Sequence, residues 1–135
     1  MSKKTLRIAG ASGFWGDASS ATAQLLTGGA VDFIVYDYLA EITMSIMARA
    51  RSKNPESGYA LDFVTAAMKP NLKDIARQGV KIISNAGGVN PQACAKALRA
   101  VIVEQGLDLQ VACVIGDDLF DQRDQLATQK ICEMY

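Results

Sequence analysis

The stretch VKIISNAGGVNPQACAKALRAVIVEQG, residues 80–106, contains a strand, a turn and a helix in succession. Val80–Ile83 is a short aliphatic run without polar alternation, which is typical of a strand covered on both faces. After the turn, Asn90 is a good helix-capping residue and Pro91 suits the first helical position. Apolar residues then recur at helical spacing up to Gly106: Cys94, Ala97, Leu98, Val101 and Ile102. This stretch therefore predicts one strand–helix unit of a parallel sheet.

The same alternation of strand and helix extends over the rest of the chain. Three further apolar runs are predicted as strands: Thr5–Ala9, Val31–Tyr36 and Val111–Ile115. A helix is predicted over Leu39–Arg51, with two more helical pieces broken near Pro70. The pattern predicts an α/β fold, Rossmann-like, with a doubly wound, mainly parallel sheet and helices on both faces. Residues 1–120 are expected to form this domain, and residues 121–135 a C-terminal helical segment that is truncated.

The composition excludes several classes of function. The 135 residues include 14 Lys and Arg, 14 Asp and Glu, and no His. A formal charge of zero gives no basic field to hold nucleic acid or an anionic membrane, so neither is expected as a partner. Without His, the chain cannot contain a Ser-His-Asp or Cys-His nucleophile system or a helical HExxH zinc site.

The three cysteines, Cys94, Cys113 and Cys132, lack the close spacing of a zinc or redox motif and are expected to be buried thiols. An odd number of cysteines without a disulfide framework favours a reducing compartment. The start of the chain lacks the apolar core of a signal peptide, and no apolar run approaches the roughly 20 residues that span a bilayer. We therefore expect a cytoplasmic protein.

Four unusual loops follow the predicted strands: Gly10–Asp17, Tyr36–Glu41, Ser84–Pro91 and Gly116–Leu119. In an open parallel sheet, ligands bind beyond the carboxyl ends of the strands, where these loops meet. Glycines in the first and third loops let backbone amides approach a phosphate or carboxylate at a helix N-terminus. A ligand-binding site is therefore predicted at this edge of the sheet.

Taken alone, the glycine spacing of the first loop resembles that of short-chain dehydrogenases, which bind NAD(P), and Asp37 is placed to bind the adenosine ribose. Against this interpretation, no Tyr has a Lys four residues later, and the carboxylate of Asp17 would repel a pyrophosphate. Glycines also make tight turns that bind nothing. A nicotinamide-dependent oxidoreductase and a purely structural turn both stay open at this point.

The four loops together resemble the acyclic terpene utilisation (AtuA) family. The motifs that carry the resemblance are Gly-Phe-Trp-Gly-Asp at 13–17, Asp-Tyr-Leu-Ala-Glu at 37–41, Asn-Ala-Gly-Gly at 85–88 and Gly-Asp-Asp-Leu at 116–119. The resemblance covers about residues 5–120 and implies that the chain is the N-terminal part of a longer protein. It also implies a role in the breakdown of citronellol and geraniol through acyl-CoA intermediates, and it leaves the reaction unassigned.

The residue types in the four loops suggest three roles. Those expected to bind a phosphate- or carboxylate-bearing ligand, such as an acyl-CoA or a terpenoid acid, are Gly10, Ser12, Gly13, Trp15, Gly16, Asn85, Gly87, Gly88 and Asn90. Asp17, Asp37 and Glu41 are candidates for acid–base catalysis, because crowded carboxylates raise one another's pKa. Asp117 and Asp118 are candidate ligands of Mg²⁺. The structural alternatives are helix capping by Asp17, Asp118 and Asn90, and core packing by Trp15.

These loops contain several carboxylates and no Lys or Arg. Balancing charge is therefore expected from a metal, a downstream domain or a second subunit, and a homodimer is the simplest assembly. Leu126, Ile131 and Met134 are apolar residues available for such a contact. A non-catalytic binding or assembly subunit is the remaining alternative to an enzyme.

Overall fold

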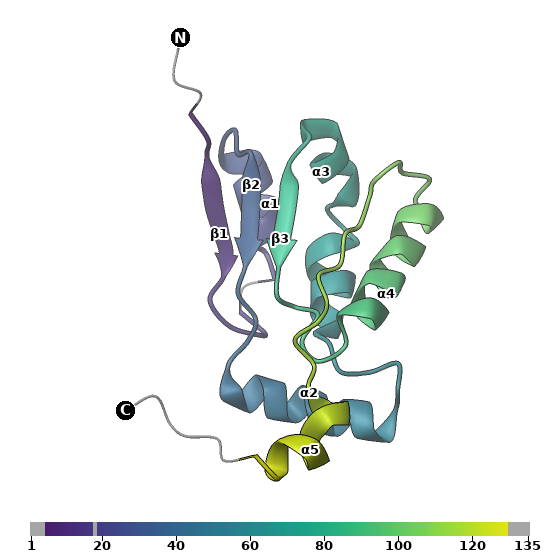
Figure 1. Ribbon diagram of the computed structural model, residues 1–135. Helices are drawn as coiled ribbons and strands as arrows, with labels where there is room; N and C mark the ends of the chain where they lie inside the picture. The colour runs from purple at the N-terminus through teal and green to yellow at the C-terminus, as the bar shows by residue number, and fades with distance from the viewer. Residues whose placement is uncertain (1–4, 18, 130–135) are drawn as a thin grey trace.

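A three-stranded parallel sheet forms the centre of the molecule (Figure 1). The computed structural model describes residues 5–17 and 19–129. Strands β1 (Ile8–Ser12), β2 (Phe33–Tyr36) and β3 (Lys81–Ser84) lie side by side in the order β1-β2-β3. Ile8 is in register with Phe33, and Phe33 with Lys81. The α/β class and the parallel sheet predicted from the sequence are confirmed.

Helices connect the strands and follow the last of them. They are α1 (Ala21–Gly28), α2 (Glu41–Lys53), the π-helix η1 (Phe63–Met68), α3 (Leu72–Gln78), α4 (Pro91–Glu104), the 3-10 turn η2 (Phe120–Gln122) and α5 (Arg123–Ala127). The predicted start of α4 is confirmed, because the Asn90 side chain accepts a hydrogen bond from the amide of Ala93. The predicted break near Pro70 separates η1 from α3. Within the described residues, no helix is long and apolar enough to cross a membrane.

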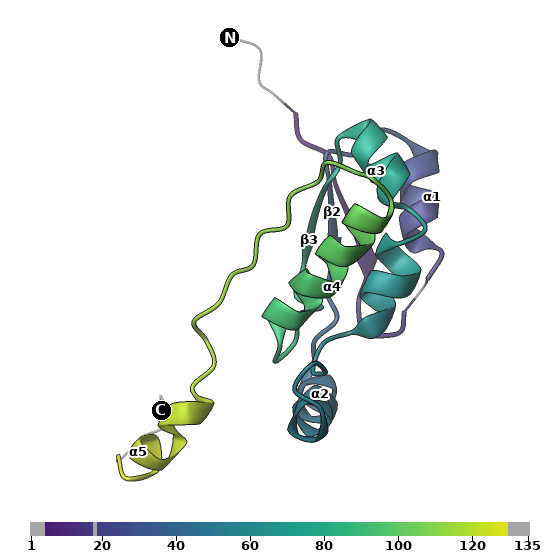
Figure 2. The ribbon, with the colours of Figure 1, turned by 90° about the vertical axis from the view of Figure 1, so that its right-hand side faces the viewer.

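One face of the sheet is covered by helices, and this face holds the core. Figure 2 shows α1 and α3 on the same side of the strands. Ile34 is fully buried, and the ring of Phe63 from η1 packs edge-on against the rings of Tyr36 and Tyr38. This aromatic cluster joins the crossover between β2 and β3 to the sheet.

The other face of the sheet is bare among the described residues. Register places Ile8, Phe33 and Ile83 on this face, where Ile8 and Ile83 are 66% and 54% exposed. Helix α4 lies beside β3 rather than over the bare face (Figures 1 and 2). The predicted helices on both faces are therefore not observed, and the doubly wound arrangement is not confirmed.

The prediction of a fourth strand at Val111–Ile115 is wrong. Residues 107–114 are extended, with odd-numbered residues half-buried and even-numbered residues exposed, but they are not paired with β3. The guanidinium of Arg99 donates to the carbonyl of Val111 at 2.6 Å, so a side chain occupies a group that a sheet ladder would use. The segment therefore has the alternating burial of a strand, but it does not form backbone hydrogen bonds of a sheet ladder with β3.

The first strand lies three residues later than predicted. The side chain of Asp32 accepts the amide of Arg7 at 2.8 Å, and the ladder with β2 begins only at Ile8. Gly10 therefore lies inside β1, opposite Val35, and not in the loop that follows the strand.

The buried hydroxyl pair between α1 and β2 gives a test of this packing. Thr22 Oγ1 and Tyr36 Oη lie 2.8 Å apart, and burial raises the pKa of Tyr36. Thr22→Val keeps the volume but leaves the Tyr36 hydroxyl without its partner, so we expect the free energy of unfolding to fall by about 1 to 3 kcal/mol. Urea denaturation measures the change. Thr27→Val, at an exposed position of the same helix, is the matched control and should change stability by less than about 0.5 kcal/mol.

Candidate functional site

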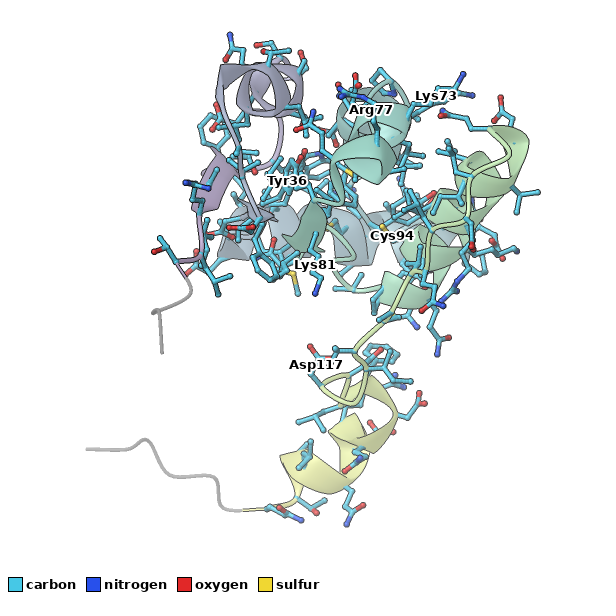
Figure 3. All side chains as sticks on the ribbon, turned by 90° about the horizontal axis from the view of Figure 1, so that it is seen from above. Tyr36, Lys73, Arg77, Lys81, Cys94 and Asp117 are labelled. Carbon is cyan, nitrogen blue, oxygen red and sulfur yellow. The ribbon has the colours of Figure 1, made fainter. Side chains whose placement is uncertain are left out.

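A large apolar cavity lies between β3, α4 and the extended segment 109–117. Its volume is about 1120 Å³. Apolar side chains from all three elements line it, among them Ile82, Leu98, Ile102, Leu109 and Val111. Figure 3, which views the sheet from above, shows Lys81 of β3, Cys94 of α4 and Asp117 of the segment. All three of these residues also line the cavity.

A second pocket of about 840 Å³ continues the cavity towards α2. It lies between Arg51 of α2, the start of α4 and residues 115–121. The two pockets share Gly88, Pro91 and residues 115–117 in their walls. We call the two pockets together the β3–α4 groove. The groove reaches the carboxyl end of β3, which is the edge where the sequence predicted a ligand site.

The loop after β3 contains Gly87 and Gly88, and close packing explains both glycines. A Cβ atom on Gly87 would lie 2.8 Å from Cα of Pro91. Gly88 has a φ of +53°, and a Cβ there would overlap the sulfur of Met47 and lie 2.8 Å from the carbonyl oxygen of Gly58. Both glycines line the groove, as predicted for ligand-binding residues, but their small size is required by the chain itself.

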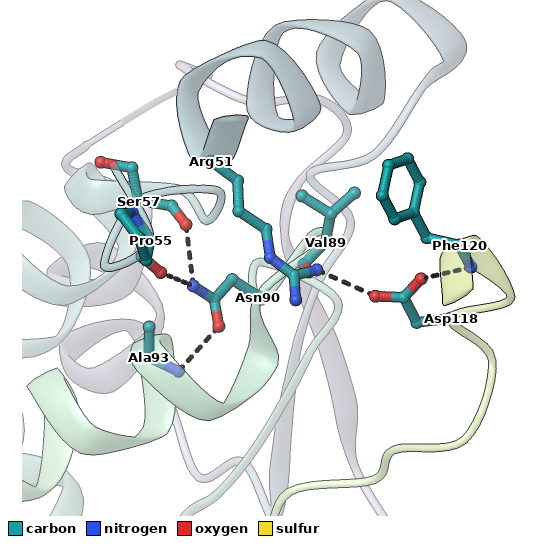
Figure 4. A network of polar contacts seen from close by, with 8 residues as sticks. All are labelled: Arg51, Pro55, Ser57, Val89, Asn90, Ala93, Asp118 and Phe120. Carbon is teal, nitrogen blue, oxygen red and sulfur yellow. Dashed lines mark hydrogen bonds and ion pairs between the residues drawn. The ribbon is translucent and has the colours of Figure 1, made fainter. Parts of the chain in front are cut away.

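Asn90 joins this loop to the crossover between α2 and η1 (Figure 4). Its Nδ2 donates to the carbonyls of Pro55 and Ser57 at 2.7 and 2.8 Å, while its Oδ1 accepts from the amide of Ala93. The capping role left open by the sequence is therefore observed, with a second role added. Asn90 lines the smaller pocket of the groove.

Arg51 is the basic residue that sequence reasoning missed. Its Nη1 donates to the carbonyl of Val89 and, at 2.9 Å, to Oδ2 of Asp118 (Figure 4). Arg51 lies in the last turn of α2, outside the four loops, and 67 residues separate it from Asp118. One feature of the sequence could have indicated Arg51. It is a basic residue in the last turn of the helix that begins at the end of the second loop, and the structure shows that this helix ends beside the third loop.

Asp118 is held at both of its carboxylate oxygens. Oδ1 accepts from the amide of Phe120 at 3.0 Å, and Oδ2 pairs with Arg51. The Phe120 amide and then Arg51 lower the pKa of Asp118, so the ion pair is present at neutral pH and is lost only in acid. The N-cap of η2 is Leu119, so Asp118 is the residue before the cap, and its side chain accepts the amide of the first residue of that turn. Asp117, its neighbour, lines both pockets of the groove.

Asp37 and Asn85 come together from the loops after β2 and β3. Asn85 Nδ2 donates to Oδ1 of Asp37 at 2.7 Å, and Asn85 Oδ1 accepts the amide of Tyr38. Ser12 Oγ donates to the carbonyl of Asp37 at 3.3 Å, so three of the predicted site residues meet at the strand ends. Glu41 is the first residue of α2 and is exposed.

The predicted acidic residues do not gather into one cluster. Among residues 5–17 and 19–129, no group of three or more Asp, Glu or Cys side chains is arranged to hold a metal ion. Magnesium binding by Asp117 and Asp118 stays a prediction.

The loop after β1 is closed by its own side chains. Asp17 Oδ2 accepts the amide of Gly13 at 3.0 Å, which places a carboxylate where an anionic ligand was predicted. Trp15 packs against the core, and its Nε1 donates to Oδ1 of Asp62 at 2.6 Å. Gly16 has a φ of +87°, as a tight turn requires. Gly10, Ser12, Gly13, Trp15 and Gly16 line neither pocket of the groove, and ligand binding by this loop stays a prediction.

Cys94 lines the groove as a buried thiol, as the sequence predicts. Burial raises its pKa to about 11, and Cys113 adds to the shift. Cys94 is therefore protonated at neutral pH and is a poor nucleophile. Cys113 is half-buried, while Cys132, Ile131 and Met134 lie outside the described residues.

These observations define a parallel α/β protein with an apolar groove at the carboxyl end of its sheet. Residues 6–134 match the family described as "Acyclic terpene utilisation family protein AtuA", and the chain belongs to this family. No curated protein and no solved structure matches the chain.

The close approach of Gly88 to Met47 and Gly58 gives a test of the loop. Gly88→Ala adds a methyl group at a left-handed position, costing about 1 to 2 kcal/mol, and forces an overlap that costs about 1 to 3 kcal/mol more. Gly79→Ala is the matched control, because Gly79 also has a positive φ of +68° but has nothing within 4 Å of the added Cβ. Urea denaturation should show the larger loss for Gly88→Ala. Equal losses would mean that only backbone conformation selects glycine at 88.

Proposed function

We propose that this protein binds an acyl-CoA or a related terpenoid acid of acyclic terpene breakdown in the β3–α4 groove. The observation that carries the proposal is a pair of adjoining pockets with shared wall residues, the larger mostly apolar along β3 and α4 and the smaller lined by Arg51. The family description supports the terpenoid part of the ligand. The proposal includes a location of the protein in the cytoplasm.

The apolar part of the groove suits a branched hydrocarbon chain. Pockets for small ligands typically have volumes of about 300–1,000 Å³ and mostly apolar walls, and the larger pocket here is about 1120 Å³. Its aliphatic walls come from β3, α4 and the extended segment, so a bound chain would lie between three elements. A terpenoid chain would gain stability by removing this surface from water.

Arg51 supplies the positive charge that the four loops lack. It already binds one carboxylate, that of Asp118. Among the described residues its hydrogen bonds all leave from Nη1, so Nε and Nη2 can donate to a phosphate or carboxylate of the ligand. Asp118 then competes with the ligand for the same guanidinium.

Asp37 is the candidate for acid–base work that the geometry favours. Asn85 donates to one of its carboxylate oxygens and lines the groove, whereas Asp37 itself lines neither pocket and would act beside Asn85 at the strand ends. Asp17 is already bonded to Gly13, and Glu41 lies at the exposed start of α2. If Mg²⁺ takes part, Asp117 is the carboxylate in both pockets that could bind it together with a ligand phosphate.

The two partners of the Arg51–Asp118 ion pair should affect binding in opposite directions. Arg51→Gln should weaken citronelloyl-CoA binding about tenfold, and Asp118→Asn should strengthen it or leave it unchanged. Isothermal titration measures both, with free citronellate and CoA as separate ligands. Arg77→Gln is the matched control, because Arg77 is an exposed Arg that pairs with Asp74 and lies outside the groove. Equal weakening by both variants would make the ion pair purely structural. Tighter binding of NADH than of CoA ligands would favour an oxidoreductase.

A bulky side chain inside the groove should block the hydrocarbon chain. Val111 is half-buried and lines the groove, whereas Val103 is exposed on α4 and lines neither pocket of the groove. Val111→Trp should reduce the affinity for citronelloyl-CoA at least tenfold and leave that for CoA alone unchanged. Val103→Trp is the control and should bind both ligands as the parent protein does. Normal citronelloyl-CoA binding by Val111→Trp would contradict the proposal.

A further inference from the structure

The bare face of the sheet is apolar and carries one charged side chain among its strand residues. Ile8, Phe33, Val35 and Ile83 share this face by register, and Lys81 lies 5.6 Å from the centre of the Phe33 ring. Phe33, Lys81 and Ile83 also line the larger pocket of the groove, so this face borders the proposed ligand site. Gly10 is also on this face, and a Cβ added there would meet nothing within 4 Å. Parallel sheets are normally covered on both faces, because their strands are apolar on both sides. This surface therefore needs a cover.

A second apolar surface lies on the segment that leaves the body after the groove. We call residues 114–127 the arm. Its exposed apolar residues are Val114 (93%), Ile115 (59%), Leu119 (52%) and Phe120 (66%). The arm also contains Asp117, Asp118, Asp121, Asp124 and Arg123. Asp118 is paired with Arg51 and Asp124 with Arg123, so Asp117 and Asp121 are the carboxylates that the arm offers to a second chain. The surface of the arm is thus apolar with negative charge, while the bare face is apolar with positive charge.

The arm is held away from the bare strand starts of its own sheet. Figure 2 shows it leaving on the side of the bare face, beyond the carboxyl ends of the strands. The Arg51–Asp118 ion pair fixes its base at that end. Ile8, Phe33 and Lys81 lie at the opposite end, where the strands begin.

We propose that the arm of a second copy covers the bare face, so that two chains exchange arms in a symmetric dimer. The two-fold axis would run perpendicular to the strands and parallel to the sheet, in front of the bare face. This rotation makes the strands of the two copies run in opposite directions. It places the arm of each copy over the N-terminal ends of the other copy's strands. Both contacts then form at once, as an isologous dimer requires. Asp121 of the partner's arm would meet Lys81, and the exposed apolar residues of that arm would meet Ile8 and Phe33.

Charge reversal on the full chain tests the exchange. Lys81→Glu and Asp121→Lys should each raise the dimer dissociation constant about tenfold in sedimentation velocity. Mixing the two variants should restore the dimer. In a mixed dimer, one of the two contacts joins the two substituted side chains, which again have opposite charges. The other contact joins the parent Lys81 of one chain to the parent Asp121 of the other. An arm that folds back within its own chain would give monomers in the mixture as well, and this result would overturn the proposal.

Apolar contact is tested by a separate pair of variants. Ile8→Asp, on the bare face, should abolish the dimer, whereas Val103→Asp should leave it intact, because Val103 is 77% exposed on α4 and outside the contact. Circular dichroism shows whether each variant is folded. A parent chain that stays monomeric at several hundred micromolar, or a folded Ile8→Asp that still dimerises, would overturn the proposal.

Discussion

The contact between the loop before Ala60 and the loop after β3 determines the architecture of the strand ends. Backbone hydrogen bonds join Val89 to Gly58 at 3.0 Å and Ala60 to Ala86 at 2.9 Å. Asn90 adds two more bonds from its side chain to the same loop. Because this contact fixes α2 against the start of α4, it also positions Arg51 beside the groove. Without this contact, nothing would hold the Arg51 side chain at a fixed position relative to the apolar part of the groove.

Local signals predicted much of the fold, and pairing decided the rest. Asn90 and Pro91 start a helix through contacts within four residues, so sequence was enough to place α4. Val111–Ile115 has the apolar, β-branched character of a strand, but being a strand also requires a neighbour that pairs with it. Arg99 binds the Val111 carbonyl, and a cavity separates the segment from β3. The sequence contains no local sign of either fact.

The site was predicted in outline for a related reason. Asp37 and Asn85 were expected at one edge because parallel strands end together, and they are hydrogen bonded there. The glycines at 87 and 88 were expected to approach a ligand, but they also approach Pro91 and Met47, which composition cannot reveal. Arg51 was missed because its partner lies far along the chain. Sequence thus indicates which loops meet, and not which side chains from neighbouring helices join them.

The groove and the bare face give one picture of the molecule, in which the extended segment 109–117 forms a wall of the ligand site and continues into the arm. Hydrogen–deuterium exchange of the full chain, with and without citronelloyl-CoA, measures where the ligand acts. Binding in the groove predicts slower exchange in residues 84–90 and 109–117, with residues 10–16 unchanged. Protection confined to residues 10–16, with the groove segments unaffected, would contradict this account of the site.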